Sequence, residues 1–278
     1  MSTVRIIPRL DIKGPNLVKG INLEGIRVLG SPQDFADYYY RVGADELIYM
    51  DVVATLYGRN SLLDFVAETA KRVFLPITVG GGLRSIGDIQ QILRAGADKV
   101  ALNTAAIKQP KLISEAANKF GSSTVVVSIE AKKRPDGSYE AYTDSGRERS
   151  GKEAVAWARE ACELGAGELL ITSIDQEGTG KGCDLVLARE VAKAVSIPVI
   201  YSGGVGKKQD ILDTLIEGRV NALALASVLH YGVLKAGYIA KAAGLFAFPK
   251  HFELLEVATI KDYLVKSGID CRVQVLRN

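Results

Sequence analysis

The sequence has few cysteines, a nearly balanced charge and no long hydrophobic run. Its three cysteines, Cys162, Cys183 and Cys271, are odd in number and far apart, which fits neither a disulfide framework nor a zinc site. This sparse usage indicates a reducing compartment, so we expect a cytoplasmic protein with no bound metal or cofactor. No run reaches the about 18 apolar residues of a membrane span, and the apolar part of MSTVRIIPRLDIKG is too short for a signal peptide.

The charges limit the partners that the chain can bind. Its 35 lysines and arginines against 32 aspartates and glutamates give a formal net charge of +3, and the basic residues are scattered along the chain. Nucleic acids and anionic membranes are bound by concentrated basic patches, so we expect neither as a partner. Small anions remain as candidate ligands.

Eight short apolar or β-branched runs alternate with helical patterns. One such pattern, SPQDFADYYYRVG, has Ser31 as its cap, Pro32 in the first turn and Gly43 as its stop. Eight repeats of a strand followed by a helix predict a closed parallel (βα)8 barrel, the TIM-barrel fold, as a single α/β domain over residues 1–278. The predicted strands lie near residues 4–10, 46–52, 75–79, 98–102, 124–130, 168–173, 197–202 and 221–226.

The sequence repeats itself at an offset of 122 or 123 residues. GADELIYMD at 43–51 corresponds to GAGELLITS at 165–173, LPITVGGG to IPVIYSGG, and KVALNTAAI at 99–107 to ALALASVLH at 222–230. Self-similarity at a fixed offset predicts two half-barrels of four strand–helix units each. In a barrel of this kind the functional residues follow the strands at their carboxyl ends.

Glycine-rich loops follow matching strands in the two halves, ITVGGGLRS at 77–85 and IYSGGVGKK at 200–208. Glycines after a strand often mark only a tight turn. They also let backbone N–H groups approach an anion at the start of a helix, so two matched loops predict two phosphate sites and a substrate with two phosphates. We expect the first site at Gly81, Gly82, Asn103 and Thr104, and the second at Gly178, Ser202, Gly203, Gly204, Ala226 and Ser227.

Two carboxylates, Asp11 and Glu130, end the first and fifth predicted strands and should face each other between the phosphate sites. A facing pair of carboxylates suits acid and base steps on one substrate. Either residue could instead cap a helix or pair with a lysine.

Four charged residues begin strands at the opposite end of the barrel. Arg5, Glu46, Lys99 and Glu168 are each followed two residues later by an apolar residue that should point inward. Buried charges are tolerated only when paired, so two cations and two anions in one layer predict a neutral ring that closes the barrel floor. Solvent-exposed strand starts are the alternative.

Seven stretches of the sequence carry a resemblance that covers almost the whole chain. They are RIIPRLDIK, LVKGINLEGIR, GADELIYMD, PITVGGGLRS, RAGADKVALNTAAI, TSIDQEGTGKG and IPVIYSGG. In these stretches the chain resembles the cyclase subunit of imidazole glycerol phosphate synthase, HisF. A related sugar-phosphate isomerase, HisA, shares the fold and the glycine loops, but the LVKG loop and the floor charges favour the cyclase.

The resemblance implies an activity and a partner. Ammonia from a HisH-like glutaminase subunit would react with a bisphosphorylated ribulosyl formimino aminoimidazole carboxamide nucleotide to give imidazole glycerol phosphate, in histidine biosynthesis. Asp11 and Glu130 would be the catalytic carboxylates, and Lys19 would be a third catalytic residue, on a mobile loop after strand 1. The four floor charges would form the ammonia gate, and Asp98 would face the glutaminase.

Three substitutions and one insertion depart from the family pattern. Glu130 and Glu177 stand where the family has aspartate, and Arg9 stands where it has cysteine, pointing into the same interior as Asp11. We expect Arg9 to engage Asp11 or Glu130, with the longer glutamate spanning a distance that an aspartate could not. About twenty extra residues near 233–254 follow strand 8 and could form an added helix or a partner surface.

These departures keep two functions open. The first is the ammonia-dependent cyclase, with Glu130 as an adapted carboxylate. The second is a HisF-like paralogue that receives ammonia from its glutaminase and passes it to an amidotransferase acting on another substrate, such as a surface sugar.

Overall fold

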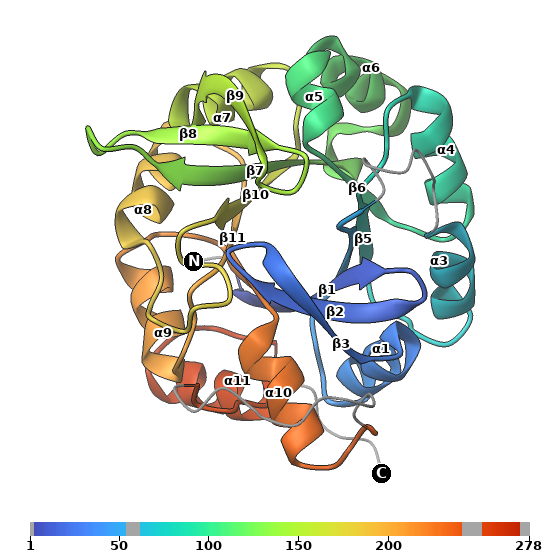
Figure 1. The fold of residues 1–278 in the computed structure, drawn as a ribbon, viewed down its shortest axis with the longest axis vertical. Helices are drawn as coiled ribbons and strands as arrows, with labels where there is room; N and C mark the ends of the chain where they lie inside the picture. The colour runs from blue at the N-terminus through green and yellow to red at the C-terminus, as the bar shows by residue number, and fades with distance from the viewer. Residues whose placement is uncertain (1–2, 54–61, 241–251, 273–278) are drawn as a thin grey trace.

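The computed structural model describes residues 3–53, 62–240 and 252–272. Its strands form a closed ring surrounded by helices (Figure 1). Neighbouring barrel strands are all parallel, and β12 pairs with β1 while β7 pairs with β10, which closes the ring. The predicted (βα)8 fold is therefore confirmed. The barrel strands are β1 (Arg5–Lys13), β4 (Leu47–Asp51), β5 (Ile77–Gly80), β6 (Lys99–Leu102), β7 (Val125–Lys133), β10 (Glu168–Ser173), β11 (Val199–Ser202) and β12 (Ala222–Leu225).

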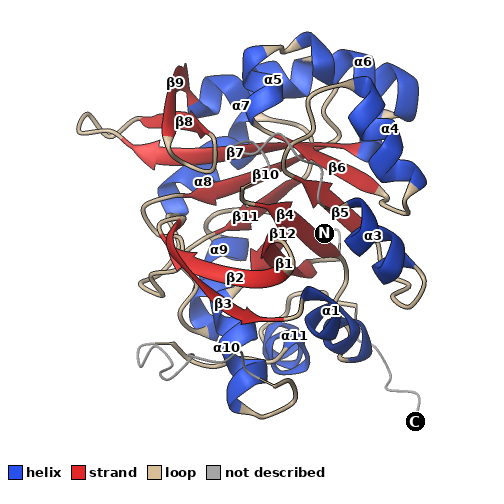
Figure 2. Ribbon diagram, turned by 45° about the vertical axis from the view of Figure 1, so that its right-hand side comes forward, coloured by secondary structure: helices blue, strands red, loops and turns tan. Residues whose placement is uncertain are grey.

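Helices cover the outside of the strand ring (Figure 2). The helix predicted after the first strand is confirmed as α1, with Ser31 in the N-cap position, Pro32 in the first turn and Gly43 at a φ of 84° just beyond its end. The helices are α1 (Pro32–Arg41), α3 (Leu63–Ala70), α4 (Ile86–Arg94), α5 (Thr104–Lys108), α6 (Lys111–Phe120), α7 (Ala154–Glu163), α8 (Leu185–Ala194), α9 (Lys208–Ile216), α10 (Ser227–Lys235) and α11 (Val257–Lys266), with a short 3₁₀ turn at Ser122–Thr124.

Two β-hairpins depart from the simple alternation of strand and helix. β2 (Asn16–Ile21) and β3 (Glu24–Gly30) follow β1, and β8 (Tyr139–Thr143) and β9 (Glu148–Glu153) follow β7. The hairpins begin 123 residues apart, at 16 and 139, and end 123 residues apart, at 30 and 153. The predicted internal repeat thus extends to these elements. Figure 1 shows β2 and β3 lying across the ring of strands.

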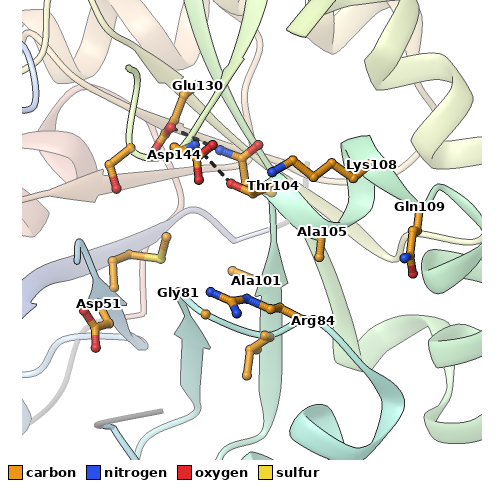
Figure 3. Close-up of a pocket in the computed structure, with 15 residues that line it drawn as sticks. Asp51, Gly81, Arg84, Ala101, Thr104, Ala105, Lys108, Gln109, Glu130 and Asp144 are labelled. Atoms are coloured by element: carbon orange, nitrogen blue, oxygen red, sulfur yellow. Dashed lines mark hydrogen bonds between the residues drawn. The ribbon is translucent and has the colours of Figure 1, made fainter. Parts of the chain in front are cut away.

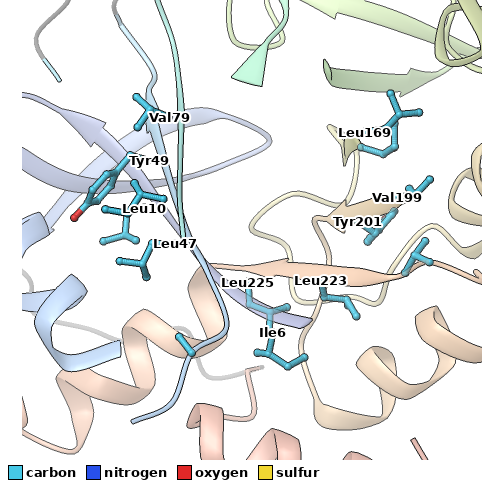
Figure 4. Packing of buried hydrophobic residues seen from close by; sticks show 14 of the residues in the cluster. Ile6, Leu10, Leu47, Tyr49, Val79, Leu169, Val199, Tyr201, Leu223 and Leu225 are labelled. Atoms are coloured by element: carbon cyan, nitrogen blue, oxygen red, sulfur yellow. The ribbon is translucent and has the colours of Figure 1, made fainter. Parts of the chain in front are cut away.

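The strands separate two apolar layers. Side chains such as Ile6, Leu10, Tyr49 and Val79 face the helices and belong to one large core (Figure 4). Alternate residues point inward and fill the barrel, as the twofold periodicity of a strand requires. The inward cluster consists of Ile7, Ile48, Met50, Ala101, Val126, Leu170, Ile200, Ala222 and Ala224.

The predicted insertion near 233–254 begins in the last turn of α10, and its residues 241–251 lie outside the described part of the chain. The chain returns at Phe252. There the backbone N–H of Glu253 donates to the Gly206 carbonyl at 2.7 Å, and that of Leu255 donates to the Val228 carbonyl at 3.1 Å. This return segment, residues 252–255, is therefore fastened to the loop after β11 and to α10.

Candidate functional site

A cavity of about 410 Å³ opens at the carboxyl ends of β4, β5, β6 and β7 (Figure 3). All four residues predicted for the first phosphate site line it: Gly81, Gly82, Asn103 and Thr104. Glu130 lies on its inner wall. Sequence reasoning missed two cations of the same cavity, Arg84 and Lys108, and the acidic side chains Asp51 and Asp144.

Glycine is required in the first loop by close packing. Gly81 has a φ of 100°, and a Cβ there would lie 2.4 Å from the Asp51 carbonyl oxygen. Ser85 and Asp88 then form a capping box that begins α4, with the Ser85 hydroxyl accepting from the Asp88 N–H at 3.2 Å. The loop is therefore held tightly between β4 and α4, with its backbone exposed to the cavity.

The residues of the second predicted phosphate site lie together beside a larger cleft of about 330 Å³. The six predicted residues line one cavity, which measures only about 20 Å³. Lys19 and Phe252 contribute to the same lining.

A buried network of charges connects Arg9, Asp11, Lys19 and Glu177. The Arg9 Nε donates to Asp11 Oδ1 at 2.8 Å, and Arg9 Nη1 donates to the Thr172 hydroxyl at 2.9 Å. Lys19 Nζ donates to Asp11 Oδ2 at 3.3 Å and to Glu177 Oε1. The prediction that Arg9 engages a carboxylate is confirmed, with Asp11 as its partner.

The protonation of this network follows from its pairing. Burial alone would raise the pKa of Asp11, but the charges of Arg9 and Lys19 hold it below its ordinary value. Burial alone would lower the pKa of Lys19, and the carboxylates of Glu177 and Asp11 hold it above its ordinary value. Both groups are therefore charged at neutral pH.

Glu130 has a different environment. Its Oε2 accepts from Asn103 Nδ2 at 3.1 Å and from the Gly146 N–H at 2.8 Å, so its hydrogen bonds go to neutral groups and Arg9 pairs with Asp11 instead. Burial raises the pKa of Glu130 to about 7, despite the opposing charge of Arg9 and the Gly146 hydrogen bond. Glu130 thus exists in both protonation states near neutral pH.

Lys19 lies on a β-strand. The segment predicted as a loop after the first strand is the β2–β3 hairpin, and Lys19 in β2 is only 3% exposed. The hairpin also contacts the loop after β10, where the Asn22 N–H donates to the Glu177 carbonyl at 2.8 Å. The hairpin carries the Lys19 ammonium into the barrel mouth.

His230 contacts the backbone of Arg9, a member of the charge network, and the sequence alone did not indicate this role. Its Nε2 lies 2.9 Å from the Arg9 carbonyl oxygen and its Nδ1 lies 2.6 Å from the Tyr39 hydroxyl. Burial lowers the pKa of His230 to about 4, so the ring is neutral, with Nε2 donating to the carbonyl and Nδ1 accepting from Tyr39. These bonds fix the backbone of β1 at Arg9.

The predicted ring of charges is present at the barrel floor. Arg5 Nη1 donates to Glu46 Oε2 at 2.9 Å, and Arg5 Nη2 donates to Glu168 Oε1. Lys99 Nζ donates to Glu46 Oε1 at 2.6 Å and to Glu168 Oε2 at 3.0 Å. Each charge therefore has two partners of opposite sign, and the layer is neutral. Glu46 lies one residue before β4, a small difference from the predicted strand start.

The inward residues above the ring are those that the sequence predicted. Ile7, Ile48, Ala101 and Leu170 each follow a ring residue by two positions, and all belong to the cluster inside the barrel. Asp98, beside Lys99, is solvent-exposed and accepts from the Ile77 N–H at 2.8 Å.

Comparisons with known proteins agree with this architecture. A family model described as histidine biosynthesis protein matches residues 5–235. Imidazole glycerol phosphate synthase subunit HisF of Legionella pneumophila is 61% identical over 210 residues, which covers 76% of this chain and 99% of that protein.

Two further relatives carry the same name. The Alkaliphilus metalliredigens protein is 46% identical over 83% of this chain and 92% of its own length. The Thermosynechococcus vestitus protein is 48% identical over 86% of this chain and 87% of its own length. The chain therefore belongs to the histidine biosynthesis protein family and, within it, to the HisF family of imidazole glycerol phosphate synthase subunits.

Proposed function

We propose that this protein is an ammonia-using cyclase subunit of histidine biosynthesis. Ammonia released by a HisH-like glutaminase subunit enters at the ring of floor charges and crosses the barrel. At the mouth it reacts with the bisphosphorylated ribulosyl formimino aminoimidazole carboxamide nucleotide. The products are imidazole glycerol phosphate and an aminoimidazole nucleotide. The names of the three relatives support this assignment, and their designation as subunits supports a glutaminase partner.

The observation that carries the proposal is the contrast between the two carboxylates at the mouth. Asp11 has a lowered pKa and stays ionised, whereas Glu130 has a pKa of about 7. Two carboxyl groups whose environments push their pKa values apart are suited to act as base and acid on one substrate. Asp11 would accept a proton, and Glu130 would donate one.

The substrate phosphates would be held by the two glycine loops. In the first cavity the loop at Gly81 and Gly82 and the start of α5 at Thr104 offer backbone N–H groups, and Arg84 and Lys108 add positive charge. The second phosphate would use Gly203, Gly204 and Ser227.

The barrel interior supports passage of a small neutral molecule. Above the floor ring the inward cluster includes the small side chains Ala101, Ala222 and Ala224. Thr78 in β5 lies between two outward residues, and its buried hydroxyl has no hydrogen-bond partner among the described residues. A reducing cytoplasm is the proposed compartment, which the three free thiols support.

The test is turnover of the bisphosphate substrate with ammonium chloride at alkaline pH, where free ammonia replaces the glutaminase. Asp11→Asn and Glu130→Gln should each lower kcat by about 100-fold or more, as expected for removal of an acid or base. The exposed carboxylates Asp136 and Glu68 provide matched controls, since Asp136→Asn and Glu68→Gln should leave turnover unchanged. Absence of product from the wild-type protein would reject the cyclase.

A second function is favoured by the buried charge network. Asp11 and Lys19 are fully engaged with Arg9 and Glu177, which opposes their use as freely titrating catalytic groups. A paralogue that only passes ammonia to an amidotransferase would keep the floor ring and tolerate this network. An Arg9→Cys, Glu130→Asp double variant distinguishes the two functions: turnover that appears only in the double variant supports the ammonia carrier.

A further inference from the structure

Lys261 is a buried cation near the barrel floor that the proposed function does not use. It lies in α11 and is only 4% exposed. Its Nζ donates to Asp45 Oδ1 at 2.6 Å and to the carbonyl oxygens of Gly43 and Arg272, both at 2.8 Å. All three N–H groups of the ammonium are therefore used, and the carboxylate of Asp45 compensates its charge.

Asp45 clamps the chain beside two residues of the floor ring. Its Oδ2 accepts from the Ile6 N–H at 2.8 Å, and its own N–H donates to the Ile6 carbonyl at 3.2 Å. Ile6 directly follows Arg5 in the sequence, and Asp45 directly precedes Glu46. The clamp therefore fixes the backbone from which the Arg5 and Glu46 side chains meet at 2.9 Å.

The same clamp recurs before two other barrel strands. Asp98 holds Ile77 in this way, with its N–H donating at 2.9 Å and its Oδ2 accepting at 2.8 Å. Asn221 holds Val199 with both hydrogen bonds at 2.9 Å, so an uncharged amide can make the clamp. Asp45 differs from both because it is buried and because its second oxygen accepts from the ammonium on α11.

The C-terminal segment, residues 270–272, is tied to the same place. Val4, just before β1, pairs in parallel with Cys271, and its N–H donates to the Asp270 carbonyl at 2.8 Å. The third residue of the segment supplies one of the three acceptors of Lys261. The ammonium therefore links α11 and the C-terminal segment to the loop before β4.

We propose that Lys261 is a positioning residue for the ring of floor charges. Through Asp45 it holds the backbones of Arg5 and Glu46 in register, so that each ring charge keeps its two partners. Without the ammonium, the buried carboxylate of Asp45 loses its counter-charge and is driven toward water. That movement releases the Ile6 N–H and separates Arg5 from Glu46.

The test compares turnover of the bisphosphate substrate with a HisH-like glutaminase and with ammonium chloride. This inference rests on the proposed function, in which ammonia enters through the ring. Lys261→Met should lower the ratio of the two rates by about fivefold or more, or about 1 kcal/mol, while turnover with ammonium chloride stays within about twofold of wild type. Lys266→Met is the matched control, because Lys266 lies on the same helix, is 74% exposed and pairs with Asp262; it should leave the ratio unchanged.

Two double variants separate the clamp from the effect of a stranded charge. Lys261→Met with Asp45→Asn keeps an oxygen that accepts from Ile6, as Asn221 does for Val199, and should return the ratio to within about twofold of wild type. Lys261→Met with Asp45→Leu lacks the clamp and should keep the low ratio. Both lack a buried unpaired charge, so their contrast does not depend on the folding of Lys261→Met alone.

A crystal structure tests the positioning without the reaction. In the double variant with Asp45→Leu, at least one of the four ion pairs of the ring should lengthen beyond about 4 Å. A ring with all four pairs intact would overturn the inference, as would the same ratio in the two double variants.

Failure of the inference and failure of the proposed function give different results. No turnover by the wild type, or an unchanged ratio in Lys99→Met, would reject the proposed function, and the crystal structure would then decide whether Lys261 positions the ring. A ratio that falls in Lys99→Met but not in Lys261→Met would overturn the inference alone. Equal losses of Lys261→Met with both nitrogen sources would also overturn it, because they indicate a purely structural ion pair.

Discussion

The pair formed by Arg9 and Asp11 can be tested as the central element of the buried charge network. Arg9→Met keeps the length and apolar character of the stem but removes the guanidinium that donates to Asp11 and Thr172. Removing one partner of a buried ion pair costs about 3–5 kcal/mol, because the other charge is left without compensation. Lys19 still donates to Asp11 at 3.3 Å in the variant, so we expect the lower end of that range, about 3 kcal/mol.

Asp11→Asn leaves the buried Arg9 with a hydrogen bond to Thr172 and the more distant charges of Glu177 and Glu130, and we expect a similar loss of about 3 kcal/mol. The double variant removes both charges and should lose about 3 kcal/mol in total rather than 6, a coupling energy of about 3 kcal/mol. At roughly 2 °C per kcal/mol for a chain of this size, each single variant lowers Tm by about 6 °C.

The assay is urea unfolding at pH 7 of the wild type, both single variants and the double variant. Arg72→Met is the matched control, because Arg72 pairs with Asp37 at 3.1 Å but is 52% exposed, and it should cost less than about 1 kcal/mol. If the double variant loses the sum of the two single losses to within about 0.5 kcal/mol, the two side chains are not coupled and the reasoning is refuted. The pH dependence of the free energy of unfolding follows from the lowered pKa of Asp11. The stabilisation by the ion pair is fully present above the ordinary pKa of 3.8 and is lost as pH falls through the lower pKa of the folded state.

Three further predictions concern other parts of the molecule. Lys99→Met or Glu168→Gln should lower turnover supported by a glutaminase at least tenfold while sparing turnover with ammonium chloride; equal losses with both nitrogen sources would indicate a purely structural ring. As pH rises from 5 to 8, the Glu130→Gln variant should become more stable relative to wild type, by on the order of 1–3 kcal/mol. The reason is that the folded pKa of Glu130, about 7, lies above the ordinary 4.5, so the wild type loses the stabilisation by protonated Glu130 as pH rises through 7. A difference in the free energy of urea unfolding that does not change with pH would contradict this. Gly81→Ala should lower Tm by roughly 6 °C in thermal unfolding, because backbone strain and the clash of the new Cβ with the Asp51 carbonyl oxygen cost about 3 kcal/mol. An unchanged Tm would show that the loop can move aside.

The barrel could be predicted from sequence because its signals are local and repeated. Each barrel strand is a short apolar run followed by a helical pattern, and the offset of 122 or 123 residues fixes how the halves correspond. The hairpins could not be predicted in the same way. The turn between β2 and β3 places Asn22 and Leu23 at φ values of 54° and 64°, which usually calls for Asn-Gly, so the strongest hairpin signal is missing.

The candidate site was predictable where residues follow strands and unpredictable where distant segments meet. Gly81 and Thr104 follow neighbouring strands, so the parallel barrel brings them to one cavity. Phe252 lines one cavity with Gly203 although the two lie 49 residues apart in the sequence, and no local pattern encodes that proximity. The partner of Glu130 was also missed, since its nearest backbone donor, Gly146, belongs to the second hairpin.

The two hairpins explain how a repeated scaffold produces two different carboxylates. In the first half, β2 carries the cation Lys19 inward to Asp11, and Arg9 adds a second cation, so the carboxylate is held ionised. In the second half, the hairpin of β8 and β9 brings the neutral Gly146 N–H to Glu130, with a smaller effect from the charge of Arg147, and burial outweighs both and raises the pKa to about 7. The two carboxyl groups therefore differ in their pKa, because the hairpins deliver different groups to equivalent strands, and this difference is what the proposed roles of base and acid require.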